Sequence, residues 1–367
     1  GVYGVKKGEP SNTPRIDALA ERGVAFQTAW TQAICGPSRA MLYTGNYAPV
    51  NGAYDNKISY HPDGRKNLPY FTRVLHDAGY VTAVAGKWHN PNPGVLGLHN
   101  DLLGVDRYCV WYGDSTRIKA ITGQERFPDD TSEIGPLSGK HLLSRYWKPT
   151  LIRDGRLLET TMQDYGPDML TDYICEFIKK EAKTEAPFIA FYSMVLAHSA
   201  HCVTPIEVAA GMAPSNKHYQ KHKPEGTKIF KNQVAYLDRL VGRVVDTVEA
   251  AGAADNTIII YASDNGTTSS SKGRGVEYGV HVPFVVAGPG IKQRGLAPVL
   301  MDFTDVLPTL ADFAGADIPA NQPVAGVSLK PFLTGTSEKT KDVIYAFPGI
   351  SSLVRTRDYL LEAVCPP

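Results

Sequence analysis

Residues 80–89 read YVTAVAGKWH, and this stretch decides the fold class. Its first six residues are aromatic, small or β-branched and carry no charge, which is typical of a strand covered on both faces of a sheet. Two other charge-free runs, 188–195 and 258–262, end similarly, with His198 soon after the first and Asp264 soon after the second. The chain therefore repeats one pattern, in which a buried strand is followed by polar side chains.

Helical patterns alternate with these strands, and several of them end at a glycine. This alternation predicts an α/β fold with a large, mostly parallel or mixed sheet sandwiched by helices. In such folds ligands bind at the carboxyl ends of the strands. The sequence predicts helices over 13–23, about 37–45, 68–78, 167–178, 234–252 and 303–314, and strands over 24–33, 80–85, 188–195, 258–262 and 282–287.

Length and composition exclude several classes of protein. A chain of 367 residues predicts one large domain with an appendage. Lys and Arg number 38 against 37 Asp and Glu, so the basic excess expected of a nucleic-acid-binding protein is absent. The longest mostly apolar stretch, residues 186–197, is shorter than the roughly 18 residues that a membrane span requires, so no transmembrane segment is expected.

Two stretches, 90–165 and 207–228, mix Asn, Pro, Gly and charged residues without a period. They are predicted to be long irregular loops. Connections of that length are usually functional, so we expect these loops to contact the substrate.

Cys35 stands out among the five cysteines, which show no C-x-x-C spacing. It lies just before Pro37, a residue suited to the first turn of a helix. A group there meets unpaired backbone N–H groups and the positive end of the helix dipole, which suit an anion or an activated nucleophile. Arg39, one turn further on, is placed to orient it. Taken alone, Cys35 is more often a buried packing residue, and Arg39 is more often a surface or structural arginine.

Lys87 and His89 follow the strand quoted above and are expected to point to the same side of the extended chain. A lysine supplies positive charge to an oxyanion, and a histidine supplies a proton at neutral pH. His198 and His201 are three residues apart, so they form either a metal pair or, for at least one of them, a structural histidine.

Asp264 and Asn265 follow another buried strand and offer adjacent oxygen ligands suited to Ca²⁺ or Mg²⁺. The alternative is an Asn-Gly turn with an aspartate that caps a helix. Lys272 lies in a segment rich in Gly and Ser, 269–275, whose spacing does not match a nucleotide-binding P-loop.

Together these residues carry a family resemblance. The C-x-P-S-R motif at 35–39 resembles the signature of type I sulfatases, members of the alkaline-phosphatase-like superfamily, and further family motifs follow in order over residues 1 to about 335. The matching segments are T-P-R-I-D at 13–17, G-K-W-H at 86–89, His198, D-N-G at 264–266, Lys272 and D-V-L-P-T at 305–309.

The resemblance implies a nucleophile and a metal site. In that family the motif cysteine, here Cys35, is oxidised to formylglycine by a separate maturation enzyme, and its hydrate attacks sulfur. The resemblance also implies a bound Ca²⁺, with Mg²⁺ less favoured, held by Asp264, Asn265 and the modified Cys35.

The resemblance assigns the remaining groups as well. Lys87, His198 and Lys272 are expected to bind sulfate oxygens or to protonate the leaving oxygen. Arg39 and His89 are expected to hold the formylglycine hydrate. The implied reaction is hydrolysis of a sulfate monoester, with a carbohydrate or an aryl group as the alcohol.

Two other functions stay open at this point. One is a phosphatase or phosphodiesterase of the same superfamily, although its nucleophile would usually be Ser or Thr. The other is a catalytically inactive, sulfatase-like binding protein. The resemblance further implies a glycan or small-molecule sulfate ester as partner and an exported protein, which is periplasmic, secreted or lysosomal.

The resemblance also predicts the domain organisation. Residues 1–335 correspond to the catalytic domain, and 336–367 to the start of a small C-terminal subdomain. In the family a first strand with two metal-binding aspartates precedes the segment that resembles Gly1–Gly4. We expect the native protein to be longer at its N-terminus and to supply that strand.

Overall fold

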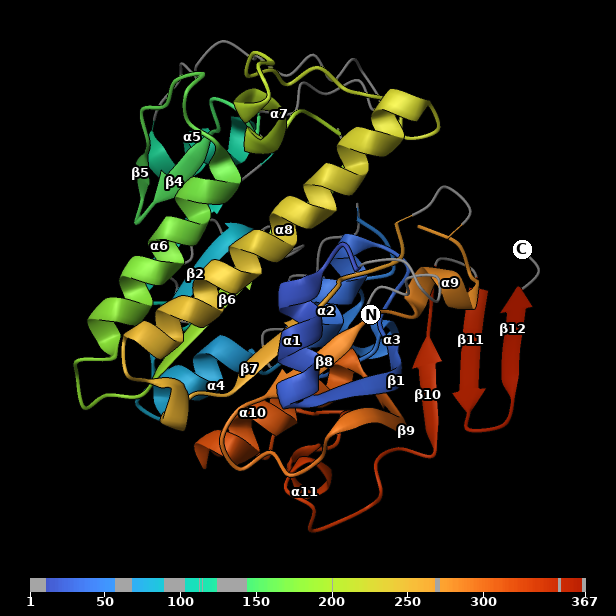
Figure 1. The fold of residues 1–367 in the computed structure, drawn as a ribbon. Helices are drawn as coiled ribbons and strands as arrows, with labels where there is room; N and C mark the ends of the chain where they lie inside the picture. The colour runs from blue at the N-terminus through green and yellow to red at the C-terminus, as the bar shows by residue number, and fades with distance from the viewer. Residues whose placement is uncertain are drawn as a thin grey trace.

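In the computed structural model, the described residues form an α/β fold of three sheets, with helices on both sides of the strands (Figure 1). His89 lies outside the residues that the structure describes, so its role in holding the formylglycine hydrate stays a prediction. Among the described residues, none of the helices is both long and apolar enough to cross a membrane. The described residues are 11–56, 68–88, 103–111, 113, 115–123, 144–199, 201–267, 271–348 and 351–364.

The five-stranded sheet contains the charge-free run at residues 80–85. Strand β2 pairs in parallel with both of its neighbours, β3 and β6, while β4 and β5 add an antiparallel edge. Lys87, the last residue of β2, lies opposite Trp111, the last residue of β3. The strands, in spatial order, are β5 (Arg156–Leu157), β4 (Leu151–Arg153), β3 (Arg107–Trp111), β2 (Val81–Lys87) and β6 (Phe188–Ser193).

A second, four-stranded sheet contains the charge-free runs at 258–262 and 282–287. Within this sheet, β1 pairs in parallel with β9, whereas β8 runs antiparallel to both of its neighbours, β7 and β1. The sequence predicts one large sheet, whereas the described strands before α11 form two separate sheets. The edge strands β6 and β7 are half-buried and pack against the same hydrophobic core. The strands, in spatial order, are β7 (Ile259–Ala262), β8 (Phe284–Ala287), β1 (Val24–Trp30) and β9 (Gly295–Asp302).

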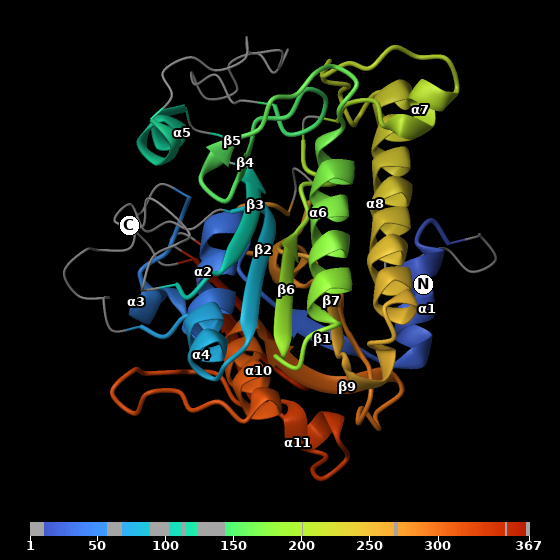
Figure 2. The same ribbon diagram turned by 90° about the vertical axis from the view of Figure 1, so that its left-hand side faces the viewer.

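Helices cover both faces of the five-stranded sheet, as predicted. Ala83 and Ala85 of β2 belong to one core, and Val84 between them belongs to another. Figure 2 shows α6 and α8 running alongside each other, with α6 next to β6. The first core packs against α1 (Pro14–Arg22), α6 (Gly166–Glu181) and α8 (Pro224–Ala250), and the second against α2 (Cys35–Thr44), α4 (Phe71–Asp77) and α10 (Val306–Ala314).

The two stretches predicted as irregular loops contain regular structure, so that prediction is wrong in part. Strands β3, β4 and β5 and helix α5 (Ser115–Thr122) lie within 90–165. Helix α7 (Pro205–Ala209) and the start of α8 at Pro224 overlap 207–228. These elements are short or begin in polar sequence. Tertiary packing therefore stabilises them where local periodicity is too weak to reveal them.

The C-terminal residues form an antiparallel three-stranded sheet, β10 (Val343–Ala346), β11 (Ser351–Thr356) and β12 (Leu360–Val364). The predicted boundary at 335/336 falls between α11 and β10 and stays a prediction. The remaining short elements are α3 (Ala48–Asn51), α9 (Glu277–Val280), α11 (Lys330–Leu333) and the 3₁₀ turns Ala254–Asn256 and Phe303–Asp305.

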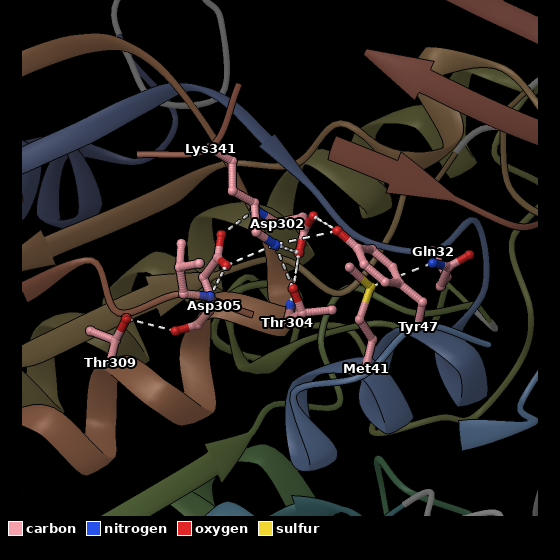
Figure 3. A network of polar contacts seen from close by, with 9 residues as sticks. Gln32, Met41, Tyr47, Asp302, Thr304, Asp305, Thr309 and Lys341 are labelled. Atoms are coloured by element: carbon pink, nitrogen blue, oxygen red, sulfur yellow. Dashed lines mark hydrogen bonds and ion pairs between the residues drawn. The ribbon is translucent and has the colours of Figure 1, made fainter. Parts of the chain in front are cut away.

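A buried ionic network joins this C-terminal sheet to the rest of the fold (Figure 3). The Lys341 ammonium, just before β10, lies 3.0 Å from a carboxylate oxygen of Asp302 and 2.8 Å from one of Asp305. Both aspartates are fully buried. Tyr47, beyond the end of α2, donates its hydroxyl to Asp302 at 2.6 Å. One lysine therefore connects the C-terminal sheet with the segment that follows α2.

Gly86 is required where β2 meets β6. Its φ is +92°, and a Cβ there would lie 1.9 Å from the carbonyl oxygen of Ser193. Gly79 has a similar φ of +89° but open space around it. We expect Gly79→Ala to lose about 1–2 kcal/mol through backbone strain alone. Gly86→Ala should lose about 1–3 kcal/mol more from the clash. Denaturant unfolding of the two variants measures the difference, and equal losses would contradict it.

Candidate active site

Cys35 is the first residue of α2 and is fully buried. The motif builds this helix start. The Ser38 hydroxyl lies 2.8 Å from the carbonyl oxygens of both Gln32 and Ile34, and the Gly36 N–H donates to the Asn56 side chain at 2.8 Å. Pro37 lies in the first turn, where a backbone N–H would have no partner within the helix. The thiol is thus held at the positive end of a ten-residue helix.

Arg39, one turn along α2, ties together the ends of three strands. Its guanidinium donates to the Lys87 carbonyl at 3.0 Å and to the Ser193 hydroxyl, and it contacts the Asp264 carboxylate at 3.0 Å. These contacts connect β2, β6 and β7 at their carboxyl ends. The Arg39 guanidinium therefore fixes Asp264 relative to the helix that carries Cys35.

Lys87 is buried at the end of β2 and faces the Cys35 helix. Burial lowers the pKa of its ammonium group to about 8, an effect that the nearby Arg39 reinforces and that Cys35 and Asp264 oppose. The side chain is still mostly protonated at pH 7. A buried ammonium that forms no ion pair with a carboxylate of the described residues is suited to binding an oxyanion.

His198 and Lys272 meet although they are distant in sequence. The Lys272 Nζ lies 3.2 Å from the Nε2 atom of His198, and the Nδ1 atom of His198 contacts the carbonyl of Ser199. Burial and the positive charge of Arg145 lower the pKa of His198 to about 4, while a hydrogen bond with Cys35 opposes this shift. The imidazole is therefore neutral at pH 7, with Nδ1–H donating to the carbonyl and Nε2 accepting from Lys272.

Asp264 and Asn265 lie directly after β7. The Asn265 amide donates to the Gly266 carbonyl at 2.7 Å, which leaves its Oδ1 atom buried without a partner among the described residues. Such an orphaned oxygen next to a carboxylate fits a hard divalent cation. These two residues supply only part of a coordination shell, and the described residues contain no cluster of three or more acidic, His or Cys groups.

The structure separates the two histidines that the sequence places three residues apart. His201 is buried, and its Nδ1 atom lies 3.0 Å from the Gln233 side-chain oxygen, in the core under α8. His201 is a structural histidine, whereas His198 lies close to Cys35, Lys87 and Lys272. No disulfide is found among the four cysteines that the structure describes.

Two residues that contact the groups around Cys35, Ser193 and Arg145, are not predicted from the sequence. Ser193 donates its hydroxyl to the Lys87 carbonyl at 2.9 Å and accepts from Arg39. Arg145 is close enough to His198 and Lys87 to lower the pKa of each. Neither residue lies in a motif, and Arg145 follows a stretch without periodicity. No local signal marks them.

The described structure thus brings Cys35, Arg39, Lys87, His198, Asp264 and Lys272 together at the carboxyl ends of strands in an α/β fold. The family model for sulfatases matches residues 2–316, and the chain belongs to the sulfatase family. It is 26% identical to human N-acetylglucosamine-6-sulfatase, over 90% of this chain and 62% of that protein. It is 27% identical to an ulvan-active sulfatase of Formosa agariphila, over 98% of this chain and 59% of that protein.

The chain thus spans about three fifths of the length of these two curated relatives. Among solved structures, that of Ps i-CgsB has a TM-score of 0.76 and 23% identity, over 96% of this chain and 78% of that one. This likeness of fold, together with the sulfatase-family match, confirms the predicted fold class.

Proposed function

We propose that this protein hydrolyses sulfate monoesters of carbohydrates. The observation that carries the proposal is the position of Cys35, buried at the N-terminus of α2 and faced by Lys87 and by the His198–Lys272 pair. This arrangement offers an anion a helix dipole, two ammonium groups and one neutral imidazole.

Each described group has a role in this proposal. Lys87 binds a sulfate oxygen by charge, because its ammonium is buried and protonated at pH 7. Lys272 is the source of a proton for the leaving alcohol oxygen, with His198 accepting its hydrogen bond and orienting it. Such general acid catalysis contributes about 10²–10⁴-fold. Arg39 keeps the Asp264 carboxylate in place beside the Cys35 helix.

Two groups complete the proposal. Oxidised to formylglycine by a maturation enzyme, position 35 supplies a hydrated aldehyde as the oxygen nucleophile toward sulfur, with Arg39 and His89 assigned to hold that hydrate. Asp264, Asn265 and the modified Cys35 would hold a divalent cation, Ca²⁺ rather than Mg²⁺, which neutralises sulfate charge. The orphaned Oδ1 atom of Asn265 supports this metal site.

The substrate class rests on the relatives. The two relatives are an N-acetylglucosamine-6-sulfatase and an ulvan-active sulfatase, so we propose a sulfated glycan. We also propose that the protein is exported. A screen for sulfate release over sulfated glycans and aryl sulfates tests the activity. Release from none of them by protein whose position 35 is shown to be modified would reject it.

The metal site has its own test. We expect Asp264→Asn to lower turnover at least about 10²-fold, because it removes the charged metal ligand. Added Ca²⁺ should raise the melting temperature of the wild type after chelation but not that of the variant. Asp255→Asn, in an exposed turn, is the matched control and should behave as the wild type. Equal Ca²⁺ stabilisation of the wild type and Asp264→Asn would reject the metal role.

A further inference from the structure

Arg145 lies beside the proposed sulfate site but comes from outside the motif segments. Its guanidinium carbon is 4.2 Å from the centre of the Trp111 ring. Trp111 ends β3 directly opposite Lys87 at the end of β2. The next residue, Tyr146, donates its hydroxyl to the backbone carbonyl of His198. Arg145 is therefore held between the strand end that carries Lys87 and the segment that carries His198.

The Arg145 side chain is buried, and its charge is unpaired within the described structure. The residue is 4% exposed, and its Nη1 atom is buried without a hydrogen-bond partner among the described residues. No carboxylate of the described residues forms an ion pair with Arg145. Arg39, by contrast, is ion-paired with Asp264 at 3.0 Å. A buried guanidinium that lacks a carboxylate is costly unless a ligand supplies the negative charge.

The surroundings of Arg145 attract anions. Burial lowers the pKa of the Arg145 guanidinium, and the nearby Tyr146, Cys35 and Cys202 side chains oppose that effect. None of these is a carboxyl group. The charge of Arg145 in turn helps lower the pKa values of His198 and Lys87. Among the described residues, the positive side chains Arg39, Lys87, Arg145 and Lys272 therefore outnumber the one carboxylate, Asp264, in this cluster.

We propose that Arg145 is a substrate-binding residue whose guanidinium fork binds an anionic oxygen of the sulfated substrate. This inference rests on the proposed function. A guanidinium offers two parallel N–H groups to a planar or tetrahedral oxyanion, which an ammonium group cannot do. The bound oxygen belongs either to the sulfate ester itself or to a second anionic group on the alcohol, such as a carboxylate or another sulfate.

The test uses Arg145→Met, which removes the charge, and Arg145→Lys, which keeps it but loses the fork. The control is Arg153→Met, because Arg153 also stacks on an aromatic ring, that of Tyr173 at 4.9 Å, but lies on the surface beside Glu176. KM and kcat are measured with two matched substrates, a neutral sugar monosulfate and the same sugar with a second anionic group. Inorganic sulfate binding is measured by calorimetry.

We expect Arg145→Met to lower kcat/KM about 10–10²-fold, the loss typical of a hydrogen bond to a charged group, with Arg145→Lys intermediate and Arg153→Met unchanged. Equal losses for both substrates, together with weaker binding of inorganic sulfate, would assign the contact to the sulfate ester. A loss confined to the doubly charged substrate would assign it to the second anionic group.

Unchanged kinetics and unchanged sulfate binding in Arg145→Met, with only a lower melting temperature, would overturn the proposal and leave Arg145 a structural residue stacked on Trp111.

The same measurements distinguish the Arg145 proposal from the proposed sulfatase activity. Wild-type protein that binds sulfate through Arg145 but hydrolyses no ester would overturn the proposed activity alone. Wild-type protein that binds neither inorganic sulfate nor either substrate and hydrolyses no ester would overturn both.

Discussion

Replacing Cys35 by alanine is expected to reduce sulfate release by about 10⁴-fold or more, the scale of losses seen when a catalytic nucleophile is removed. The remaining cationic groups still bind the substrate, but no group at the start of α2 can attack sulfur. The measurement is sulfate release under single-turnover and steady-state conditions, with thermal unfolding to show that the fold is kept. Peptide mass spectrometry of the wild type should show an aldehyde in place of the thiol at position 35.

Cys175→Ala is the matched control, since Cys175 is another buried cysteine, on α6 and beside Arg243. It should keep full activity and lose only the stability that a small buried side chain contributes. Full turnover by wild-type protein that mass spectrometry shows to be entirely cysteine at position 35 would refute the formylglycine mechanism, even if the alanine variant is inactive.

Lys341→Met is expected to destabilise the protein by about 3–5 kcal/mol, because it removes the cation that compensates two fully buried carboxylates. Denaturant unfolding at pH 7 measures this loss. Lys330→Met is the control, because Lys330 pairs with Asp312 at the surface, where ion pairs contribute about 0–1 kcal/mol. Similar losses in the two variants would show that the buried network does not stabilise the fold.

The same network predicts a pH dependence. Burial, reinforced by the neighbouring Asp302, raises the pKa of Asp305 to about 7, while Lys341 opposes the shift. A raised pKa means that the folded state binds a proton more tightly than the unfolded state does. This contribution to stability is therefore complete below pH about 4 and is lost as the pH rises to about 7.

Removing Lys341 takes away the group that opposes this shift, so the pKa of Asp305 should rise further. The destabilisation by Lys341→Met is then expected to be smaller at pH 5 than at pH 8, because protonation neutralises the unpaired carboxylate. Comparing the difference in unfolding free energy between variant and wild type at the two pH values cancels the other titrating groups. A difference that is independent of pH would contradict the network described here.

Local sequence was sufficient to predict the strands and helices that hold the proposed catalytic groups. The charge-free runs at 80–85 and 258–262 predict β2 and β7 within about two residues, because a strand buried on both faces must be apolar along its whole length. Proline at the start and glycine at the end likewise predict α1. The order of strand, turn and helix therefore already brings Lys87 and Asp264 to strand ends.

Tertiary structure alone decided which distant groups meet. The antiparallel direction of β8, the contact of Lys341 with two aspartates, and the burial of Arg145 beside Trp111 and Lys87 all depend on residues far apart in the chain. Hydrophobic period and capping residues report only on the local backbone, whereas a buried charge is tolerated according to what packs around it. The sequence by itself thus determined the elements and the motif residues expected around Cys35, and only folding determined that Arg145 and Ser193 join them.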